Sequence, residues 1–475
     1  MATTKKTKIV ATLGPACDTI EKMEELSIAG VNVFRINFSH ADYDNVTRMV
    51  KDIREMNERL GHNCAILADL QGPKLRVGDM GDGVNLSKGD TFTFTTKECK
   101  GTKERAFMTY KRFPRDVKKG EFILVDDGKL KFEVVDTDGI SEVVSKVIVG
   151  GKLNSKKGVN LPNTKISQPA LTKKDIEDAI FAINLEVDWF ALSFVRRPRD
   201  IKELQELIEL HSDYKIPIIA KIEKPEAVKN IDKIVKYADG LMVARGDLGV
   251  ELPMEEVPLI QKMLVEKAKS ARIPVIIATQ MMESMIENSV PTRAEVNDVA
   301  NSVMDGADAL MLSGETSVGK HPVLVVQQMR RIIEKVENSS RIVVPKKAPH
   351  IKTKRYITKS ICYHAALMSD DISAAAIQTL TNSGYTAFQI SAWRPNTNIL
   401  AYTSNKRILS RLNLLWGVKA FYYDRMKSTD QTVEDLIEIA VKEEYAQKGD
   451  LVITLSSMPV QAKGMVNTLR LTRIK

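Results

Sequence analysis

The sequence predicts a (β/α)8 TIM barrel, with a small all-β domain inserted after the third strand and a C-terminal α/β open-sheet domain. Short runs rich in Val, Ile and Leu recur eight times, and a segment with helical apolar spacing follows each run. The runs lack in-and-out alternation, which is typical of parallel strands buried on both faces. Eight such units indicate a closed barrel covered by helices. The runs span residues 8–14, 31–38, 64–70, 187–194, 216–223, 240–246, 273–280 and 309–314.

Start signals mark the intervening helices. Asp18 precedes the string IEKMEEL and is expected to cap a helix there. Pro225 opens EAVKNIDKIVKYA, which we interpret as one helix, because proline favours the first helical turn.

The repeat is interrupted after the third strand. GDTFTFTT, GEFILVDDG, KLKFEVVDTDG and EVVSKVIVGG are short alternating strands separated by Gly and Asp turns. We therefore expect residues 73–170 to form a β-barrel lid domain over the mouth of the main barrel. Residues 1–72 and 171–339 form the main barrel in this interpretation.

The chain changes character again after Ser339. The Pro- and Lys-rich string VVPKKAPHIKTK is typical of a linker, and a helix near 356–369 follows it. Strand-like runs then alternate with helices: ISAAAIQTL, NILAYTSN, VKAFYYD, DLVITLSS and NTLRLTRI. Residues 340–475 are therefore expected to form a third, α/β domain with an open sheet.

Composition and charge exclude several classes of protein. Apolar residues make up 43% and charged residues 28% of the chain, which is typical of globular domains rather than disordered or fibrous ones. No apolar run approaches the ~18 residues of a membrane helix, and the N-terminus lacks a signal peptide, so we expect a cytoplasmic protein without membrane contact. The four cysteines lie far apart, which favours reduced thiols. The net charge of +9 suits anionic small substrates as well as nucleic acid, and we expect no nucleic-acid partner, since no basic block is interleaved with aromatics.

Polar side chains follow seven of the eight predicted barrel strands. Because residues just past the C-terminal ends of barrel strands line one face, where catalytic groups lie, this pattern favours an active site. One or two such residues could be structural, but seven polar strand ends are hard to explain in that way. The residues are Arg35, Asn37, Ser39, His40, Asp69, Ser193, Lys221, Glu223, Arg245, Gly246, Asp247, Thr279, Gln280, Ser313, Gly314 and Glu315.

The residue types narrow the chemistry. Glu223 and Asp247 follow neighbouring strands, and two carboxylates suit a hard cation such as Mg²⁺ held partly by substrate oxygens. The alternative is that they form ion pairs with Lys221 and Arg245. Lys221 lies two residues before Glu223, so both can point to the same side of a strand. Its ammonium suits either stabilisation of negative charge in a transition state or a Schiff base with a carbonyl substrate. Other cations suited to phosphate groups are Arg35, Arg76 and Lys157.

Together these motifs resemble the pyruvate kinase family. The matching strings are TKIVATLGPA, FRINFSH, SKKGVNLP, IIAKIE, LMVARGDLGVELP, IIATQMMESMI and NDVANSVMDGADALMLSGET, and the resemblance runs to the closing NTLRL. The family's architecture is the one expected above. The resemblance implies Mg²⁺- or Mn²⁺-dependent transfer of a phosphoryl group from phosphoenolpyruvate to ADP, giving pyruvate and ATP in the last step of glycolysis.

The resemblance also implies residue roles. Arg35 and Lys221 would hold the phosphoryl group in flight, and Glu223 and Asp247 would bind the divalent metal. The backbone of Gly246, with Asp247 and Thr279, would seat the pyruvate carboxylate. The nucleotide would be bound by Thr12, His40, Arg76 and Lys157.

Thr279 and Ser313 would relay a proton to the enolate carbon, although the group that donates this proton is left open. Lys157 would arrive from the inserted domain as part of a lid, and closure would exclude water from the reacting groups.

Two other functions are weighed against this one. A Mg²⁺-dependent pyruvate lyase or aldolase on the same barrel would use the two carboxylates, or Lys221 as an imine. It needs no nucleotide, so it leaves Arg76, Lys157 and the inserted domain unexplained. A nucleic-acid-binding protein would exploit the positive charge and would show a steep salt dependence.

A monovalent-cation site is implied beside the phosphoryl site. The family commonly holds K⁺ there with oxygens that match Asn37, Ser39, Asp69 and the backbone of Leu70. Members that require K⁺ typically have Thr in place of Leu70 and Glu in place of Lys74, whereas K⁺-independent members carry that lysine. We therefore expect Lys74 to replace the ion, so that K⁺ is not required; the alternative is a solvated hinge lysine with K⁺ still bound.

The C-terminal domain is expected to bind an effector, and the family implies a homotetramer. Hydroxyl side chains surround Gly384 at a strand-to-helix turn, where they can hold a phosphate or simply cap the helix. The family often has a basic residue in place of Tyr385, and the string SSMPVQAKG lacks a recognisable second phosphate loop. A sugar monophosphate or AMP is therefore expected rather than fructose 1,6-bisphosphate. The proposed effector residues are Thr379, Thr381, Ser383 and Thr386.

Overall fold

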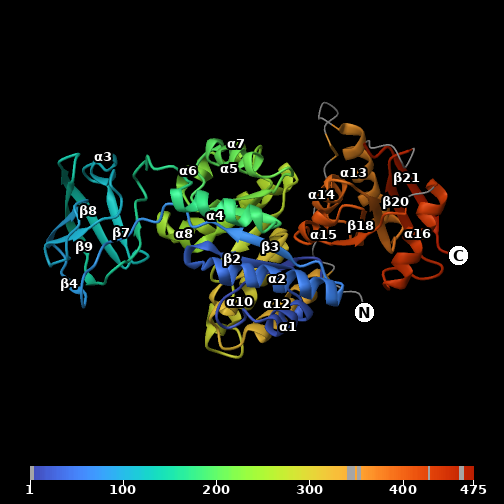
Figure 1. Cartoon of the computed structure of the whole chain (residues 1–475), viewed down its shortest axis with the longest axis horizontal. Helices are drawn as coiled ribbons and strands as arrows, with labels where there is room; N and C mark the ends of the chain where they lie inside the picture. Colours follow the sequence, from blue (N-terminus) through green and yellow to red (C-terminus); the bar gives the residue numbers. More distant parts are fainter. Residues whose placement is uncertain (1–4, 340–347, 350–354, 426–427, 459–464) are drawn as a thin grey trace.

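The computed structural model describes residues 5–339, 348–349, 355–425, 428–458 and 465–475. Three bodies lie in a row (Figure 1), with the inserted β-domain at one end, the barrel in the centre and the C-terminal domain at the other end. The predicted linker string after Ser339 lies largely outside the described residues. No helix in the described ranges combines the length and apolar character needed to cross a lipid bilayer.

The predicted (β/α)8 barrel is confirmed. The eight predicted runs contain the eight parallel strands of a closed barrel, in the order β1-β16-β15-β14-β13-β12-β3-β2. Each pairs in parallel with its neighbours, and β2 closes the ring against β1. The strands are β1 (Lys8–Thr12), β2 (Val33–Asn37), β3 (Ala65–Asp69), β12 (Trp189–Leu192), β13 (Ile218–Ile222), β14 (Gly240–Ala244), β15 (Val275–Ala278) and β16 (Ala309–Leu312).

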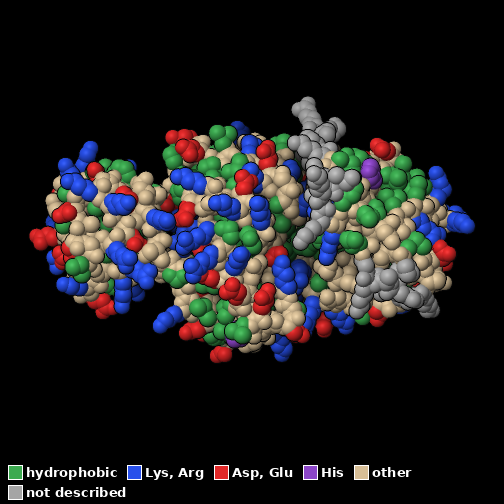
Figure 2. Space-filling model, turned by 90° about the horizontal axis from the view of Figure 1, so that it is seen from above, with side chains coloured by type: hydrophobic (Ala, Val, Ile, Leu, Met, Phe, Trp, Pro, Cys, Tyr) green, Lys and Arg blue, Asp and Glu red, His purple; other side chains and the backbone are tan. Residues whose placement is uncertain are grey.

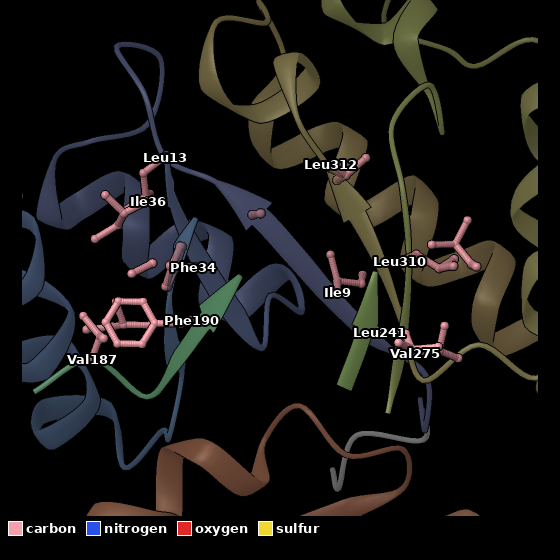
Figure 3. Packing of buried hydrophobic residues seen from close by; sticks show 14 of the residues in the cluster. Ile9, Leu13, Phe34, Ile36, Val187, Phe190, Leu241, Val275, Leu310 and Leu312 are labelled. Atoms are coloured by element: carbon pink, nitrogen blue, oxygen red, sulfur yellow. The ribbon is translucent and has the colours of Figure 1, made fainter. Parts of the chain in front are cut away.

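Alternation along each strand creates two separate cores. Ile9, Phe34, Phe190 and Leu310 belong to the cluster between the strands and the surrounding helices, part of which is shown in Figure 3. Their strand neighbours fill the barrel interior: Val10, Val33, Ala65, Leu67, Trp189, Ala191, Ile219, Met242, Ile276, Ala278, Ala309 and Met311. Because the strand period is two, the next inward positions toward the C-terminal end are the polar residues of the predicted site.

Helices cover the barrel, and one begins at Pro225 as predicted. One predicted cap and one predicted helix length need correction. Thr19, not Asp18, caps the first helix, because its hydroxyl accepts from the N–H of Lys22. The segment after Pro225 forms two short helices instead of one, since Asn230 lies between them outside helical geometry. The helices are α1 (Ile20–Ala29), α2 (Tyr43–Leu60), α4 (Lys173–Asn184), α5 (Pro198–His211), α6 (Pro225–Lys229), α7 (Ile231–Ile234), α8 (Arg245–Glu251), α9 (Val257–Ala271), α10 (Arg293–Asp305), α11 (Gly314–Ser317) and α12 (Pro322–Glu337), with 3₁₀ turns η1 (Phe38–His40), η2 (Met254–Glu256) and η3 (Glu283–Ile286).

The inserted domain is all-β apart from one helical turn. A six-stranded sheet has the order β11-β7-β8-β9-β5-β6, and β10 pairs with β4 beside it. Arg76 bridges to Gly158 at one edge and Val77 bridges to Met108 at the other, so residues 76–77 join the two edges of this sheet. The elements are β4 (Val84–Leu86), β5 (Thr91–Thr95), β6 (Arg105–Phe107), α3 (Phe113–Asp116), β7 (Phe122–Val125), β8 (Leu130–Thr137), β9 (Glu142–Val149), β10 (Gly151–Leu153) and β11 (Val159–Asn160).

The C-terminal domain is the predicted α/β unit, and it closes the N-terminal end of the barrel. Its sheet has the order β19-β18-β17-β20-β21, with only β21 antiparallel. Leu414 belongs to the interior cluster of the barrel, and Trp189 Nε1 donates to the carbonyl of Arg411 at 3.2 Å. The elements are α13 (Tyr356–Asp371), β17 (Ala376–Leu380), α14 (Tyr385–Ala392), β18 (Asn398–Thr403), α15 (Lys406–Leu412), β19 (Val418–Tyr422), α16 (Thr429–Lys442), β20 (Leu451–Ser456) and β21 (Thr468–Arg473).

Candidate active site

A polar cavity of about 100 Å³ lies at the C-terminal end of the barrel. Its floor is apolar, formed by inward side chains of the barrel strands, and its walls are charged. This is the arrangement expected when polar residues follow parallel strands that meet at one barrel face. The lining residues are Arg35, Asn37, Ser39, Asp69, Leu70, Gln71, Lys74, Ser193, Phe194, Lys221, Glu223, Met242, Ala244, Asp247, Ala278, Thr279, Met311 and Ser313.

Lys221 lies between two carboxylates in this cavity. Its Nζ is 3.1 Å from Asp69 Oδ1 and 3.0 Å from Glu223 Oε1, and it donates to Ser193 Oγ at 2.7 Å. Burial opposes the charge, but the two carboxylates outweigh it and raise the pKa of Lys221 above its usual value. The ammonium is therefore fixed and charged at neutral pH.

Arg35 supplies a second fixed cation. Its Nε donates to Asp69 Oδ2 at 2.6 Å, and its Nη1 donates to Thr12 Oγ1 at 3.0 Å. Burial favours a neutral Asp69, yet Lys221 and Arg35 together hold the pKa of this carboxyl below its usual range. Thr12 is buried beneath Arg35, donates to the carbonyl of Leu312 at 2.9 Å and does not line the cavity. Thr12 thus orients Arg35.

Glu223 and Asp247 form an all-oxygen donor pair. Glu223 Oε2 accepts from the N–H of Phe194 at 2.8 Å, which fixes the carboxylate at the end of β13. Desolvation by the surrounding protein and the neighbouring Glu223 carboxylate raise the pKa of Asp247 to about 6. Glu223 is buried and Asp247 is exposed. Two neighbouring carboxylates that repel each other in this way fit a hard divalent cation such as Mg²⁺, which would neutralise both.

Thr279 has a strained backbone at the end of β15. Its φ is +70°, an outlier for a β-branched residue, and such strain is typical of functional sites. The Thr279 hydroxyl donates to the carbonyl of Ala278 at 2.6 Å and accepts from the N–H of Gly246 at 2.8 Å. Gly246 does not itself line the cavity, because its N–H points to the Thr279 hydroxyl. Ser313, at the end of the neighbouring strand β16, also lines the cavity.

The predicted monovalent-cation residues meet in the same cavity. Asn37, Ser39 and Leu70 all line it, and the carbonyl of Leu70 accepts from Ser193 Oγ at 2.7 Å. Lys74 lines it as well. Burial and the Lys221 ammonium lower the pKa of Lys74, whereas Asp247 and Glu223 act in the opposite direction, so all of these charges act on one another.

A second cavity, of about 300 Å³, lies where the inserted domain meets the barrel. Arg76 and Lys157 line it from the inserted domain, Lys74 lines it from the hinge, and Asp247 lines it from the barrel. Lys157 Nζ is 2.9 Å from Asp126 Oδ1. Figure 2 shows the narrow junction between the two bodies and the Lys and Arg side chains beside it. The side chain of His40 lies outside the described part of the structure.

Comparison with known proteins decides the family. Residues 4–326 match the family model "Pyruvate kinase, barrel domain", and residues 359–472 match "Pyruvate kinase, alpha/beta domain". The chain belongs to the pyruvate kinase family. Its activity is therefore that of a phosphotransferase acting on phosphoenolpyruvate and ADP, with pyruvate and ATP as products.

Full-length relatives agree with this assignment. A pyruvate kinase from Mycobacterium tuberculosis is 43% identical over 473 residues, which is 99% of each chain. A pyruvate kinase from Geobacillus stearothermophilus is 43% identical and covers 98% of this chain and 80% of its own. A crystal structure of a pyruvate kinase from Cryptosporidium parvum has a TM-score of 0.92 at 33% identity and covers 100% of this chain and 97% of its own. The lyase or aldolase alternative is not favoured by these findings.

Sequence reasoning gave no specific role to several residues of this pyruvate kinase site. Ser193 stood among the polar strand ends, but only the structure shows it linking Lys221 to the Leu70 carbonyl. Phe194 carries no chemical signal in the sequence; its N–H holds Glu223, and its φ is +55°. Glu315 Oε2 accepts from the N–H of Ser313 at 2.7 Å and so fixes the last strand end.

The expected effector loop of the C-terminal domain is compact. Thr381 Oγ1 accepts from the N–H of Gly384 at 2.9 Å, and Gly384, with φ +81°, precedes α14. Thr379 and Thr386 are buried, and Ser383 is exposed. The guanidinium of Arg355 lies 4.4 Å from the ring centroid of Tyr385, so a cation stands beside the position where the family often has one. The last part of SSMPVQAKG, residues 459–464, lies outside the described residues.

Proposed function

We propose that Arg35 and Lys221 hold the phosphoryl group during its transfer from phosphoenolpyruvate to ADP. The observation that carries this proposal is the Lys221 ammonium, kept charged by Asp69 and Glu223 at the edge of the cavity. Fixed cations that need no reorganisation stabilise charge that develops on equatorial phosphoryl oxygens. Asp69 and Ser193 orient these cations and do not touch substrate in this scheme.

Glu223 and Asp247 would hold Mg²⁺, or Mn²⁺ in its place, and the remaining ligands would come from substrate oxygens. When bound, the metal supplies positive charge that stabilises the enolate and phosphoryl oxygens. The chain's own part is to hold both carboxylates in position for the metal. The bond from the Phe194 N–H to Glu223 supports this arrangement.

Thr279 would seat the pyruvate carboxylate together with the start of α8, which contains Gly246 and Asp247. In this assignment Thr279 and Ser313 relay the proton that reaches the enolate carbon. The strained backbone of Thr279 supports a functional position, because such strain persists only where the surrounding structure enforces it. The final proton donor is left unassigned.

Arg76, Lys157 and His40 would contact the nucleotide, and Thr12 would act through Arg35. Both described cations of this set line the cavity between the domains, which supports their placement on the nucleotide side. Closure of residues 73–170 over the mouth of the barrel would exclude water and protect the enolate. The barrel in this scheme comprises residues 1–72 and 171–339.

We also propose that Lys74 replaces K⁺. In this proposal the Lys74 ammonium supplies the positive charge at the cation site. The oxygens of that site come from Asn37, Ser39, Asp69 and the Leu70 carbonyl. The presence of Lys74 in the lining of the same cavity supports this assignment. One fixed ammonium can supply the field of a monovalent cation without its binding equilibrium.

We also propose how the protein is regulated and how it assembles. Residues 340–475 would bind a sugar monophosphate or AMP at Thr379, Thr381, Ser383 and Thr386, with little response to fructose 1,6-bisphosphate. Titrating the three compounds into a steady-state assay tests this, and strong activation by the bisphosphate would contradict it. A cytoplasmic homotetramer is proposed, and exposed Met254 and Leu259, at 76% and 71%, offer apolar surface for self-association.

The decisive experiment is a coupled assay for pyruvate formation from phosphoenolpyruvate, ADP and Mg²⁺. The proposed roles require pyruvate release that depends on both ADP and the metal. Labelling of Lys221 by borohydride in the presence of pyruvate would instead indicate a Schiff base and contradict the assigned role.

A further inference from the structure

A partly buried contact joins the inserted domain to the barrel beside the metal carboxylates. Asn160 Nδ2, on β11, donates to Glu251 Oε1 at 2.8 Å. The same oxygen forms an ion pair with Lys224 Nζ. Glu251 is 4% exposed and Lys224 is 7% exposed, so water screens neither charge effectively. We call Asn160, Glu251 and Lys224 the latch.

The latch residues are close in sequence to the residues of the proposed site, so a change in the latch can shift those residues. Lys224 directly follows Glu223, and Glu251 lies one helical turn after Asp247 on α8, so each charged latch residue is tied to one of the carboxylates. Asn160 lies three residues after Lys157, within ~10 Å along an extended chain. The latch therefore links the segment that carries the nucleotide-side lysine to both elements that carry the metal carboxylates.

Other contacts at this junction do not fix β11. Arg196 donates to the carbonyls of Ile166 and Gln168 at 2.6 and 2.7 Å, but these residues belong to the segment that returns to the barrel. Gly72 is held by Asp175 at the opposite hinge, with 2.9 Å between N and Oδ1. Within the part of the chain that the structure describes, the hydrogen bond of Asn160 is the one that joins a strand of the inserted domain to a barrel helix.

We propose that Glu251 is a positioning residue which, through Asn160, holds the Lys157 segment over the metal carboxylates and thereby sets the affinity for ADP. Lys224 pairs with the Glu251 carboxylate in its buried position, and the amide of Asn160 adds the bond between the domains. This inference rests on the nucleotide-side role proposed above for Lys157. It predicts that the latch affects nucleotide binding more than binding of phosphoenolpyruvate.

The first test is Asn160→Ala, which removes the bond between the domains and leaves the Glu251–Lys224 pair in place. A hydrogen bond to a charged group supports an expected rise of about 10-fold in KM for ADP, with KM for phosphoenolpyruvate changed less than 2-fold. Asn85→Ala, at an exposed position on β4 of the same domain, is the matched control and should leave both values unchanged. Equal KM values for ADP in wild type and Asn160→Ala would overturn the proposal.

The second test exchanges the chemistry of the contact. Asn160→Asp sets a carboxylate against Glu251 and should raise KM for ADP further. Combining Asn160→Asp with Glu251→Gln exchanges the amide and the carboxylate, so one carboxylate again faces the Lys224 ammonium. This double variant should recover at least half of the lost affinity for ADP. Failure of this rescue, with both proteins folded, would refute direct action through the contact.

Domain closure gives a readout that does not depend on turnover. Cys99 of the inserted domain is partly exposed, whereas Cys17, Cys64 and Cys362 are buried, so dyes on Cys99 and on Leu210→Cys of α5 should report the distance between the domains. Energy transfer should rise on adding Mg²⁺ and ADP, and Asn160→Ala should reduce that rise. An identical rise in both proteins would count against the latch. An inactive wild type would refute the proposed function, whereas an active wild type matched by Asn160→Ala would refute the latch alone.

Discussion

Replacing Lys221 by Met tests the electrostatic core of the site, and the structure predicts two separate losses. Met has similar length but carries no charge, so the ion pairs with Asp69 and Glu223 disappear together with the bond to Ser193. Asp69 keeps Arg35 at 2.6 Å. Glu223 keeps no other cation within ion-pair distance among the residues that the structure describes.

One buried, uncompensated carboxylate sets the size of the stability effect. Breaking a buried ion pair by removing one partner costs about 3–5 kcal/mol in free energy of unfolding. For a domain of this size the loss corresponds to a decrease in Tm of roughly 10 °C. The catalytic loss is expected to be ~10²–10⁴-fold in turnover, the range for removing one preorganised charge.

The assay must separate these two losses. Thermal unfolding gives the first, and a coupled assay run well below the Tm of the variant gives the second. Lys229→Met, at an exposed position on α6, is the matched control, with an expected change of at most about 0.5 kcal/mol. A folded Lys221→Met protein with near-normal turnover would refute the phosphoryl role. Wild-type stability would refute the inference that Glu223 depends on this ammonium.

Three further predictions concern the metal, the monovalent site and a buried lysine. Glu223→Gln or Asp247→Asn should raise the Mg²⁺ concentration needed for half-maximal activity at least 10-fold; unchanged metal dependence in both variants would place the metal elsewhere. The wild type should be fully active in tetramethylammonium buffer without K⁺, whereas Lys74→Glu should need KCl; a wild type rescued by KCl would show that Lys74 does not replace the ion. Burial lowers the pKa of Lys5 from 10.5 to about 7, so between these values the folded chain binds fewer protons than the unfolded chain, and the stability of the wild type rises with pH. The stability of Lys5→Met relative to wild type, from denaturant unfolding, should therefore fall from pH 7 to pH 10 by at most ~1.4 kcal/mol per pH unit; an equal difference at pH 7 and pH 9 would contradict this.

The periodic features of the chain were predictable from the sequence. All eight barrel strands lie within the runs identified from their apolar residues, because burial on both faces leaves a signature in every residue of a parallel strand. Helix ends were less certain. The first helix is capped by Thr19 and not by the neighbouring Asp18, because adjacent polar side chains compete for the same cap position. The helix expected after Pro225 is divided at Asn230, because the local backbone geometry there is not helical.

The sequence by itself determined which polar residues share the barrel mouth. A strand period of two, together with parallel strands that end at one face, brings Arg35, Asp69, Lys221 and Glu223 together without further information. The tertiary structure alone decided how they are paired: Lys221 between two carboxylates, Ser193 bonded to the Leu70 carbonyl, and the Gly246 N–H directed to Thr279. It also decided that Asn160 of the inserted domain reaches Glu251 on α8. The last three of these contacts join residues 123, 33 and 91 positions apart, and their distances depend on how whole elements pack, which no local pattern in the chain encodes.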